Sequence, residues 1–450
     1  MTTDRLPDDS AILIVAFFYA PMLNARAFRW TALAEAWAAQ GKRVSVVCSW
    51  APGLPRVEMR NGVAIYRTGN RGLERLRALY AHRRRQAASP RSPVPASPAS
   101  GLASGIRGAP ARWLLHGWRN VYWPDGSCLW YFAAMDRARA LLRKTPGAAL
   151  ITVSPTFTAV AVGYALNRTS FRPGRWLIDM GDPFCFAEEA PPNNFRLYRG
   201  LNRWFERRCF QRADAVSVTN APTAERYGIL FPEIAAKIAV IPPLLSGKSA
   251  PRPANPPASA THAPQPVRLV YLGTLYRTIR RPDFLLALFA GARRRGEGAG
   301  MELHFYGDVD QCRESFRPYS ALVGTALFLH GVVPRDEALR AIEAASILVN
   351  IGNDTPYQLP SKLVEYAATG KPILCISSIE NDSSIRFLQG YPASLPLLDR
   401  QGPPTAGQLD AFTDFLSSGA RPVQPELLRA WLSPYRLTGI LGRYGELLSP

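Results

Sequence analysis

Short apolar runs alternate with longer segments of helical periodicity along most of this chain. The runs are continuous rather than alternately apolar and polar, which is typical of parallel strands buried on both faces. Strands are predicted at 12–17, 43–48, 149–153, 175–180, 214–218 and 237–241, then at 267–272, 301–306, 326–330, 346–351 and 372–376. Amphipathic segments predict helices at 26–40, 156–166, 196–212, 282–295 and 335–345. This rhythm predicts an α/β protein with helices on both faces of parallel sheets.

Two stretches rich in Pro, Ser, Ala and Gly interrupt the rhythm. Residues 86–112 predict a mobile loop, and residues 247–266 separate the two series of strands as a linker. The predicted domains are therefore 1–246 and 267–425, each with a Rossmann-like sheet. Residues 426–450 are expected to form a C-terminal helix that packs back on the first domain.

The chain of 450 residues carries a formal net charge of +20. So large an excess indicates an anionic partner: nucleic acid, an anionic membrane surface or a phosphorylated ligand. No helix-turn-helix, RRM or zinc-finger pattern is present, so nucleic acid is not the expected partner. The six cysteines lack metal-ligand spacing. They fit a reduced, cytoplasmic protein and predict no metal site.

The first apolar run gives no reason to expect export. It follows Asp8 and Asp9 rather than a basic region. It is also too short to span a bilayer, and a buried strand explains it better.

The segment PYQLPSKLVEYAATGKP at 356–372 combines a helix start with charge. Ser361 can cap a helix, and the backbone N–H groups of Ser361, Lys362 and Leu363 would then form an anion site beside the Lys362 ammonium. Glu365 lies one turn on, where a carboxylate can accept hydrogen bonds from sugar hydroxyls. The arrangement suits a nucleotide diphosphate with its ribose.

A second group of cations follows the predicted strand end at Gly273. The loop GTLYRTIRRPD holds Arg277, Arg280 and Arg281. If this loop faces the helix at 361, a pyrophosphate would be held from two sides. The alternative is a basic surface loop in an arginine-rich protein.

These motifs resemble the donor domain of GT-B glycosyltransferases, specifically the retaining family 4 of bacterial polysaccharide synthesis. The matching features are the YLG turn, the FYGD strand end, FLHGVVPRDEALRAIEAASILVN and PSKLVEYAATGKPIL. In the first half, FFYAPMLNARAFRWTALAEAWAAQGKRVSVVCS, LIDMGDPF and KIAVIPP match more loosely. The resemblance covers most of the chain outside the two Pro-rich stretches. Tyr357 departs from it, because the family usually has a glutamate there.

The resemblance implies two Rossmann-like domains facing each other across a cleft. It implies an enzyme that transfers sugar from a nucleotide-diphosphate sugar to a glycan or polyprenyl-linked acceptor, with retention of configuration and without metal or cofactor. The expected donor-binding residues are Gly273, Arg277, Arg281, Tyr357, Ser361, Lys362, Leu363 and Glu365. Lys362, Glu365 and Asp182 are the expected catalytic residues, and Asn24, Arg26 and Asp182 the acceptor-side residues. For Asp182, a helix cap is the alternative.

The charge also suggests a membrane surface. Residues 71–85 hold six arginines interleaved with leucines, and 105–123 is basic and aromatic. Such stretches suit an anionic bilayer at the cytoplasmic face, although ordinary surface helices would look similar.

Two other functions remain open at this stage. One is a nucleotide-sugar 2-epimerase-like GT-B enzyme, which would isomerise the donor without an acceptor. The other is a basic nucleic-acid-binding protein, which would bind DNA in a salt-dependent manner without binding a nucleotide sugar.

Overall fold

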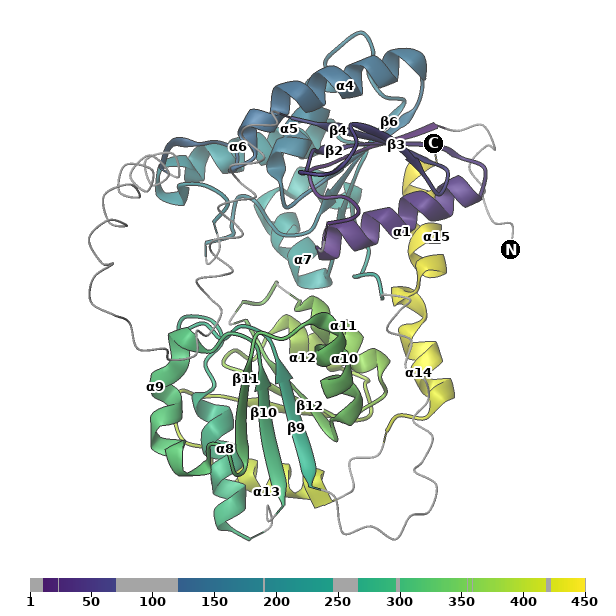
Figure 1. Ribbon diagram of the computed structural model, residues 1–450. Coiled ribbons are helices and arrows are strands. Elements are labelled where there is room, and N and C mark those ends of the chain that lie inside the picture. The colour runs from purple at the N-terminus through teal and green to yellow at the C-terminus, as the bar shows by residue number, and fades with distance from the viewer. Residues whose placement is uncertain are drawn as a thin grey trace, which may run out of the picture. The chain divides into compact units, whose positions relative to one another are not determined.

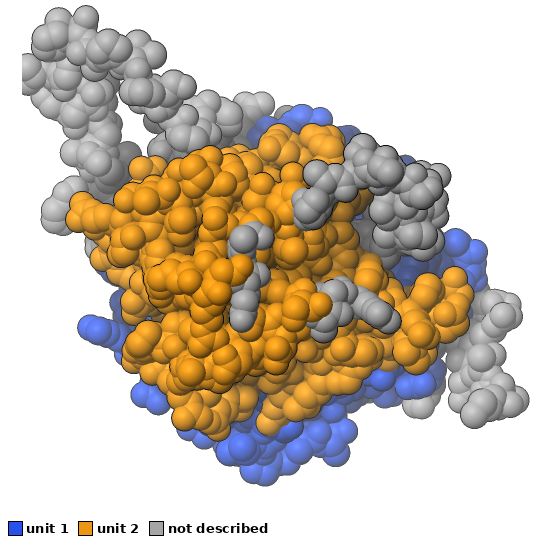
Figure 2. Space-filling model, turned by 90° about the horizontal axis from the view of Figure 1, so that it is seen from below, with its two compact units in different colours: residues 1–87, 91–242, 437–450 blue, residues 88–90, 243–436 orange. Residues whose placement is uncertain are grey.

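The structure is a computed structural model that describes residues 11–22, 24–69, 120–188, 191–245, 266–296, 300–353, 355–357, 359–417 and 422–449. The predicted loop at 86–112 and nearly all of the predicted linker lie outside these residues. The chain divides into two compact units, coloured separately in Figure 2. Among the described residues, unit 1 runs to Pro242 and resumes at Leu437, and unit 2 is Pro243–Arg436.

Unit 1 is built on an eight-stranded sheet in the order β3-β4-β2-β1-β5-β6-β7-β8, parallel except for β3. Its strands are β1 (Ala11–Ala16), β2 (Arg43–Ser49), β3 (Val57–Arg60), β4 (Val63–Thr68), β5 (Ala149–Val153), β6 (Arg175–Met180), β7 (Ala215–Val218) and β8 (Ile238–Val240). The central strands are buried along nearly their whole length. The six strands predicted for the first half are therefore confirmed to within two residues.

Helices cover both faces of this sheet. Those of unit 1 are α1 (Ala25–Ala39), α4 (Tyr131–Lys144), α5 (Phe157–Leu166), α6 (Phe195–Arg212), α7 (Ala221–Leu230) and α15 (Leu437–Leu448), with a short 3₁₀ turn, η1, at Cys128–Trp130. Figure 1 shows α1 with α15 on one face and α4, α5 and α6 on the other.

The β3–β4 hairpin was not predicted. Its turn is Asn61-Gly62, and both residues have positive φ, 47° and 79°. That is the conformation a two-residue hairpin requires and Asn-Gly favours. The Asn-Gly dipeptide could therefore have predicted the hairpin. It was not recognised because β3 is short and charged and does not resemble a strand in sequence.

Unit 2 holds a six-stranded, wholly parallel sheet in the order β11-β10-β9-β12-β13-β14. Its strands are β9 (Val267–Leu272), β10 (Met301–Tyr306), β11 (Leu327–Gly331), β12 (Ile347–Ile351), β13 (Ile373–Ser377) and β14 (Ser394–Leu398). Its helices are α8 (Asp283–Arg294), α9 (Arg313–Phe316), α10 (Arg335–Ala344), α11 (Ser361–Ala368), α12 (Ser383–Leu388), α13 (Ala406–Ser417) and α14 (Pro425–Leu432). Among the strands of unit 2, β14, an edge strand that contains Pro396, was not predicted. The helices α9, α12 and α13 were not predicted either.

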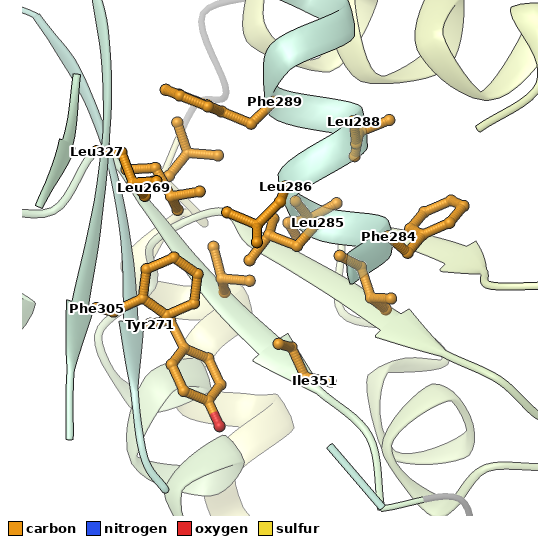
Figure 3. Packing of buried hydrophobic residues seen from close by; sticks show 14 of the residues in the cluster. Leu269, Tyr271, Phe284, Leu285, Leu286, Leu288, Phe289, Phe305, Leu327 and Ile351 are labelled. Carbon is orange, nitrogen blue, oxygen red and sulfur yellow. The ribbon is translucent and has the colours of Figure 1, made fainter. Parts of the chain in front are cut away.

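Two apolar clusters fix the layers of unit 2. On one face, alternate residues of β9 and β10, such as Leu269 and Phe305, pack against α8, as Figure 3 shows. On the other face, Val270 and Leu272 pack against Leu363 and Tyr366 of α11. Because both faces are covered, the strands can be uniformly apolar, which the sequence pattern required.

The end of the chain differs from the prediction. Residues 426–450 were expected to form a C-terminal helix that packs back on the first domain, and α15 does pack there. The first part of this segment does not. Instead α14 belongs to unit 2 and α15 to unit 1. The pattern alone could not show this because both helices are amphipathic, and each buries its apolar face against a different unit.

A buried network holds α15 and α1 to the sheet of unit 1. Asp179 in β6 accepts hydrogen bonds from Arg26 (2.8 Å), Trp30 (2.9 Å), Ser217 (2.8 Å) and the Tyr444 hydroxyl (2.8 Å). Burial alone would raise the pKa of Asp179, but the neighbouring arginines and hydroxyl donors hold that pKa below its usual value.

Arg29 extends this network to the end of unit 1. Its guanidinium donates to the carbonyl oxygens of Ile241 (3.3 Å) and Pro242 and to the Tyr444 hydroxyl (2.9 Å). One buried cation therefore fixes both the segment where the chain leaves unit 1 and the helix with which it returns.

Replacing Asp179 with alanine should destabilise unit 1 strongly. The change leaves buried arginine charge without its carboxylate, which typically costs about 3–5 kcal/mol. Urea unfolding followed by tryptophan fluorescence measures the loss. Asp410→Ala is the control, because it breaks an exposed ion pair with Arg295 and should cost about 1 kcal/mol or less. Equal effects of the two substitutions would contradict this account of the network.

Candidate functional site

The candidate site begins where the strands of unit 2 end. Gly273 and Gly307 follow β9 and β10, with positive φ of 154° and 138°. The Gly273 N–H donates to the Tyr306 carbonyl (2.8 Å), and the Gly307 N–H donates to that of Gly331 (2.7 Å). A Cβ on Gly307 would lie 2.0 Å from the Gly273 carbonyl oxygen. Glycine is therefore required here for close approach of backbone to backbone, at the edge where α/β sheets bind ligands.

Helix α11 places Lys362 over this edge. The Lys362 ammonium donates to the carbonyl of Leu272, the last residue of β9, at 3.3 Å. One turn along, the Tyr366 hydroxyl accepts a hydrogen bond from the Leu272 N–H (3.1 Å), so the helix is pinned to the strand end. Surrounding protein atoms lower the pKa of Lys362, Arg280 lowers it further, and Glu365 opposes the shift.

The start of α11 differs in detail from the prediction. Pro360, not Ser361, occupies the N-cap position, and Ser361 is the first helical residue. The Leu363 N–H donates to the Pro360 carbonyl (3.0 Å), and the Leu363 side chain is fully buried. Leu363 therefore contributes to the core. Of the three backbone N–H groups predicted to form an anion site, those of Ser361 and Lys362 remain as candidates.

Arg280 is the cation that the structure brings to Lys362. The loop after Gly273 closes on itself through a reciprocal backbone pair between Tyr276 and Arg280. The Arg280 guanidinium then donates to the Asn353 side-chain oxygen at 2.6 Å, just beyond β12. Its partner there is neutral, so Arg280 keeps its positive charge available beside Lys362.

Arg277 and Arg281 lie elsewhere. Together with Asp283, they line a surface hollow of about 530 Å³ next to α9. Arg281 pairs with the Asp283 carboxylate at 3.1 Å, and Arg277 donates to the carbonyl of Gln311 at 3.4 Å. Neither Lys362 nor Glu365 lines that hollow. Arg277 and Arg281 therefore line a hollow that none of the other predicted donor-binding residues lines.

Glu365 and Tyr357 complete the predicted donor set. Glu365 is half-buried and lies 3.8 Å from the guanidinium of Arg335, at the start of α10. Tyr357 is half-buried in the loop between β12 and α11. Lys371, the second lysine of the segment, donates to the carbonyls of Glu343 and Ala345 at the end of α10. That lysine is thus a helix cap and not part of the site.

The predicted acceptor-side residues meet at one edge of unit 1. Asn24 is the N-cap of α1, and its side chain accepts from the Arg26 N–H (2.8 Å). Arg26 pairs with buried Asp179 at 2.8 Å, and its guanidinium lies against Gly181. Asp182 is exposed on the loop after β6, and the next helix has Asn194 as its N-cap. Asp182 therefore caps no helix, which removes the structural alternative for it.

A buried carboxylate holds the Asp182 loop in place. Glu206 of α6 accepts from the N–H groups of Phe184 (3.2 Å) and Cys185 (3.0 Å) and from the Tyr227 hydroxyl (2.6 Å). Phe184 stacks on Phe157 at a ring separation of 3.8 Å. Burial raises the pKa of Glu206 to about 7. Sequence analysis did not single out Glu206, which reads there as one charge on a polar helix.

The Asp-x-Asp pair in YGDVDQ makes local contacts. Asp308 accepts from the Asp310 N–H (2.9 Å), and Asp310 pairs with Arg313 at 2.9 Å. Across the described ranges, no group of three or more His, Cys, Asp or Glu side chains is placed to hold a metal ion.

The chain matches no protein-family model and no curated protein in sequence. Solved structures do resemble it in fold. They include a glycosyltransferase from Rickettsia africae, with 11% identity over 98% of both chains and a TM-score of 0.55. HepE of Anabaena bound to UDP has 10% identity, coverage of 97% of this chain and 98% of its own, and a TM-score of 0.55. The catalytic domain of starch synthase IV from Arabidopsis thaliana, bound to ADP and acarbose, has 10% identity, coverage of 98% and 99%, and a TM-score of 0.54.

These full-length matches and the two parallel sheets define the fold class as GT-B, as the sequence predicts. Each unit is a Rossmann-like α/β domain. Within the described residues, no helix is both long and apolar enough to cross a membrane.

Three side chains of the site were not assigned from the sequence: Arg280 was named only within its cluster, and Asn353 and Arg335 were not considered. A signal existed for Asn353 and Arg335. Each follows the carboxyl end of a predicted strand, and in a parallel sheet these ends share one edge. For Arg280 no local signal distinguishes it from its two neighbours, because only the closed loop decides which side chain turns inward.

Glu206 should make stability depend on pH. Its pKa of about 7 lies above the ordinary 4.5, so the folded state binds more protons than the unfolded state between these values. The unfolding free energy should therefore fall as pH rises from about 4.5 to 7, by roughly 3 kcal/mol. Glu206→Gln should remove this component, and the difference between the two urea-unfolding profiles measures it. Parallel profiles would refute the assignment.

Proposed function

We propose that this protein is a glycosyltransferase that moves a sugar from a nucleotide-diphosphate sugar to a glycan or lipid-linked acceptor, with retention of configuration. The observation that carries the proposal is the pair of cations Lys362 and Arg280 at the carboxyl edge of the unit 2 sheet, beside Glu365. HepE, which shares the fold, was solved with UDP and with UDP-glucose. That supports a nucleotide sugar as the donor.

The two cations would neutralise the diphosphate as it leaves. The positive charge of Arg280 helps to lower the pKa of Lys362, and a bound anion would relieve the repulsion between the two cations. The N-terminus of α11 adds backbone N–H groups and the positive end of the helix dipole. Charge developing on the leaving group is then stabilised by preorganised donors, and no metal ion is needed for this work.

Glu365 would bind the ribose. Its carboxylate lies one turn from Lys362 on α11 and 3.8 Å from the guanidinium of Arg335. Tyr357 takes the position that in the resembling family touches the transferred sugar, and its ring would select the donor there.

In the transfer step, the acceptor hydroxyl oxygen bonds to the anomeric carbon while the bond from that carbon to the phosphate oxygen breaks. Attack from the same face retains the configuration, and the departing phosphate takes the hydroxyl proton. Asp182, exposed on its fixed loop, would orient the acceptor, with Asn24 and Arg26 shaping the same edge of unit 1.

We also propose that the enzyme works on the cytoplasmic membrane surface as a peripheral protein. The net charge of +20 supports attraction to anionic lipids. The predicted basic stretch at 71–85 and most of 105–123 lie outside the described residues.

Lys362→Ala and Glu365→Gln should each reduce sugar transfer strongly while the fold is kept. Loss of one preorganised charge at a leaving group typically costs about 3 kcal/mol of transition-state stabilisation, or a factor of a hundred or more in rate. Turnover of a panel of nucleotide sugars, with circular dichroism as the check on folding, measures this. Near-wild-type rates for both variants would overturn the donor site.

The matched arginine variants sharpen that test. Arg280→Ala should cost more than Arg281→Ala, because only Arg280 lies beside Lys362. Arg317→Ala, at an exposed position on the same unit, serves as the control for loss of a surface cation. The reverse order of Arg280 and Arg281 would restore the assignment made from sequence.

Sugar transfer should persist in excess EDTA. If Lys362, Arg280 and the α11 N-terminus neutralise the diphosphate, chelation removes nothing that the reaction uses. The rate is compared with and without EDTA, and then after Mn²⁺ is added back. A rate lost in EDTA and recovered with Mn²⁺ would contradict the proposal and would direct attention to Asp308 and Asp310.

A further inference from the structure

An apolar groove opens on the α4–α6 side of unit 1. Its volume is about 610 Å³, and it lies between η1, the start of α4, the second half of α5 and α6. The walls are mainly apolar and aromatic, formed by Trp123, Leu129, Phe132, Tyr164 and Phe205 among others. Figure 1 shows α4, α5 and α6 together on this side of the sheet.

The rim of the groove exposes large apolar side chains. Phe132 is 75% exposed and Trp204 51% exposed, and Leu129, Leu197 and Leu201 are exposed as well. On α6 the exposed positions 197, 201 and 204 follow helical spacing and so share one stripe. Trp204 packs on Phe205, which lines the groove. Exposed apolar side chains gathered in this way mark an interaction surface, because leaving them in water is unfavourable.

Positive charge flanks the same stripe. Helix α6 carries six arginines and one acidic residue, Glu206, which is fully buried. The arginines are Arg196, Arg199, Arg203, Arg207, Arg208 and Arg212. Of these only Arg207 has a carboxylate partner in the part of the chain that the structure describes. At the groove itself, Arg168 and Arg212 lie over the Tyr164 ring, each 5.5 Å from its centre.

We infer that the α4–α6 face docks on an anionic lipid bilayer, with Phe132 and Trp204 entering the interface and a lipid chain lying in the groove. Exposed aromatic and aliphatic side chains beside arginines match a surface that is apolar inside and negatively charged outside. A second copy of this chain fits less well, because a symmetric contact would bring two arginine-rich helices together. The inference rests on the peripheral-membrane part of the proposed function.

Vesicle co-sedimentation tests the inference without sugar transfer, so its failure leaves the donor site untouched. The wild type should bind vesicles of phosphatidylglycerol and phosphatidylcholine, and bind pure phosphatidylcholine weakly. Phe132→Ser combined with Trp204→Ser should weaken binding to the mixed vesicles at least tenfold, because two inserted aromatic groups are lost. Donor turnover and circular dichroism of the variant confirm that it is folded.

The matched control removes equally exposed apolar groups from other parts of unit 1. Met59 on β3 is 68% exposed and Ile229 on α7 is 71% exposed. Met59→Ser with Ile229→Ser should bind vesicles like the wild type. An equal loss in this control would show non-specific adhesion and would overturn the inference.

A second variant separates charge from insertion. Arg199→Ser with Arg203→Ser should remove the part of binding that high salt screens and should leave the salt-resistant part. The aromatic variant should show the opposite pattern. Arg172→Ser with Arg226→Ser, exposed arginines outside α6, serves as the control and should have a smaller effect.

Three further outcomes would also overturn the inference. The wild type could ignore the mixed vesicles at low salt. The aromatic variant could bind them as tightly as the wild type. Finally, sedimentation velocity could show a dimer that the aromatic variant abolishes, which would assign the face to a second copy. Loss of thermal stability in the aromatic variant, with no vesicle binding by the wild type, would assign it to another part of this chain.

Discussion

Both sheets of this protein are buried on both faces, and that constraint decides where chemistry can occur. A parallel strand covered by helices on either side has no room for an unpaired charge along its length. Polar side chains that meet a ligand must therefore stand beyond the strand ends. In unit 2 that edge carries Lys362, Arg280 and Glu365. Lys362 and Glu365 come from α11, and Arg280 comes from the loop after β9.

The electrostatics of that edge favour an anion. Arg280 donates a hydrogen bond to the neutral Asn353 side chain. Because that partner carries no negative charge, it does not neutralise Arg280, and the charge of Arg280 helps to lower the pKa of Lys362. Glu365, the nearest carboxylate to Lys362 in its helix, is shared with Arg335. Two cations held close without full neutralisation repel each other, and the proposed diphosphate would relieve that repulsion. Under the proposed function, part of the affinity for a nucleotide sugar would therefore come from the charge arrangement of the free protein.

Unit 1 uses its charge differently. Arg26 pairs directly with the buried carboxylate of Asp179, and Arg29 donates to the Tyr444 hydroxyl that is bonded to the same carboxylate. These contacts hold α1 and α15 against the sheet. Arg26, which was predicted to face an acceptor, therefore also has a structural role as the partner of Asp179. Asp182 stays exposed, and the carboxylate that orders its loop, Glu206, lies on the same helix whose outer side bears the apolar stripe and the arginines. One helix thus supports both the loop that carries Asp182 and the proposed lipid-binding face.

The sequence by itself determined the α/β class, almost every strand, the division into two sheets and a short helix at 362–369, which the structure has as α11, Ser361–Ala368. It could do so because continuous apolar runs and helical periodicity are local properties, set by which faces each element buries. Only the tertiary structure decided which of Arg277, Arg280 and Arg281 joins Lys362, that Lys371 caps α10, and that α14 and α15 belong to different units. Those outcomes depend on contacts between residues far apart in the chain. The three arginines, for example, are indistinguishable in sequence and differ only in the residues that surround them in the folded protein.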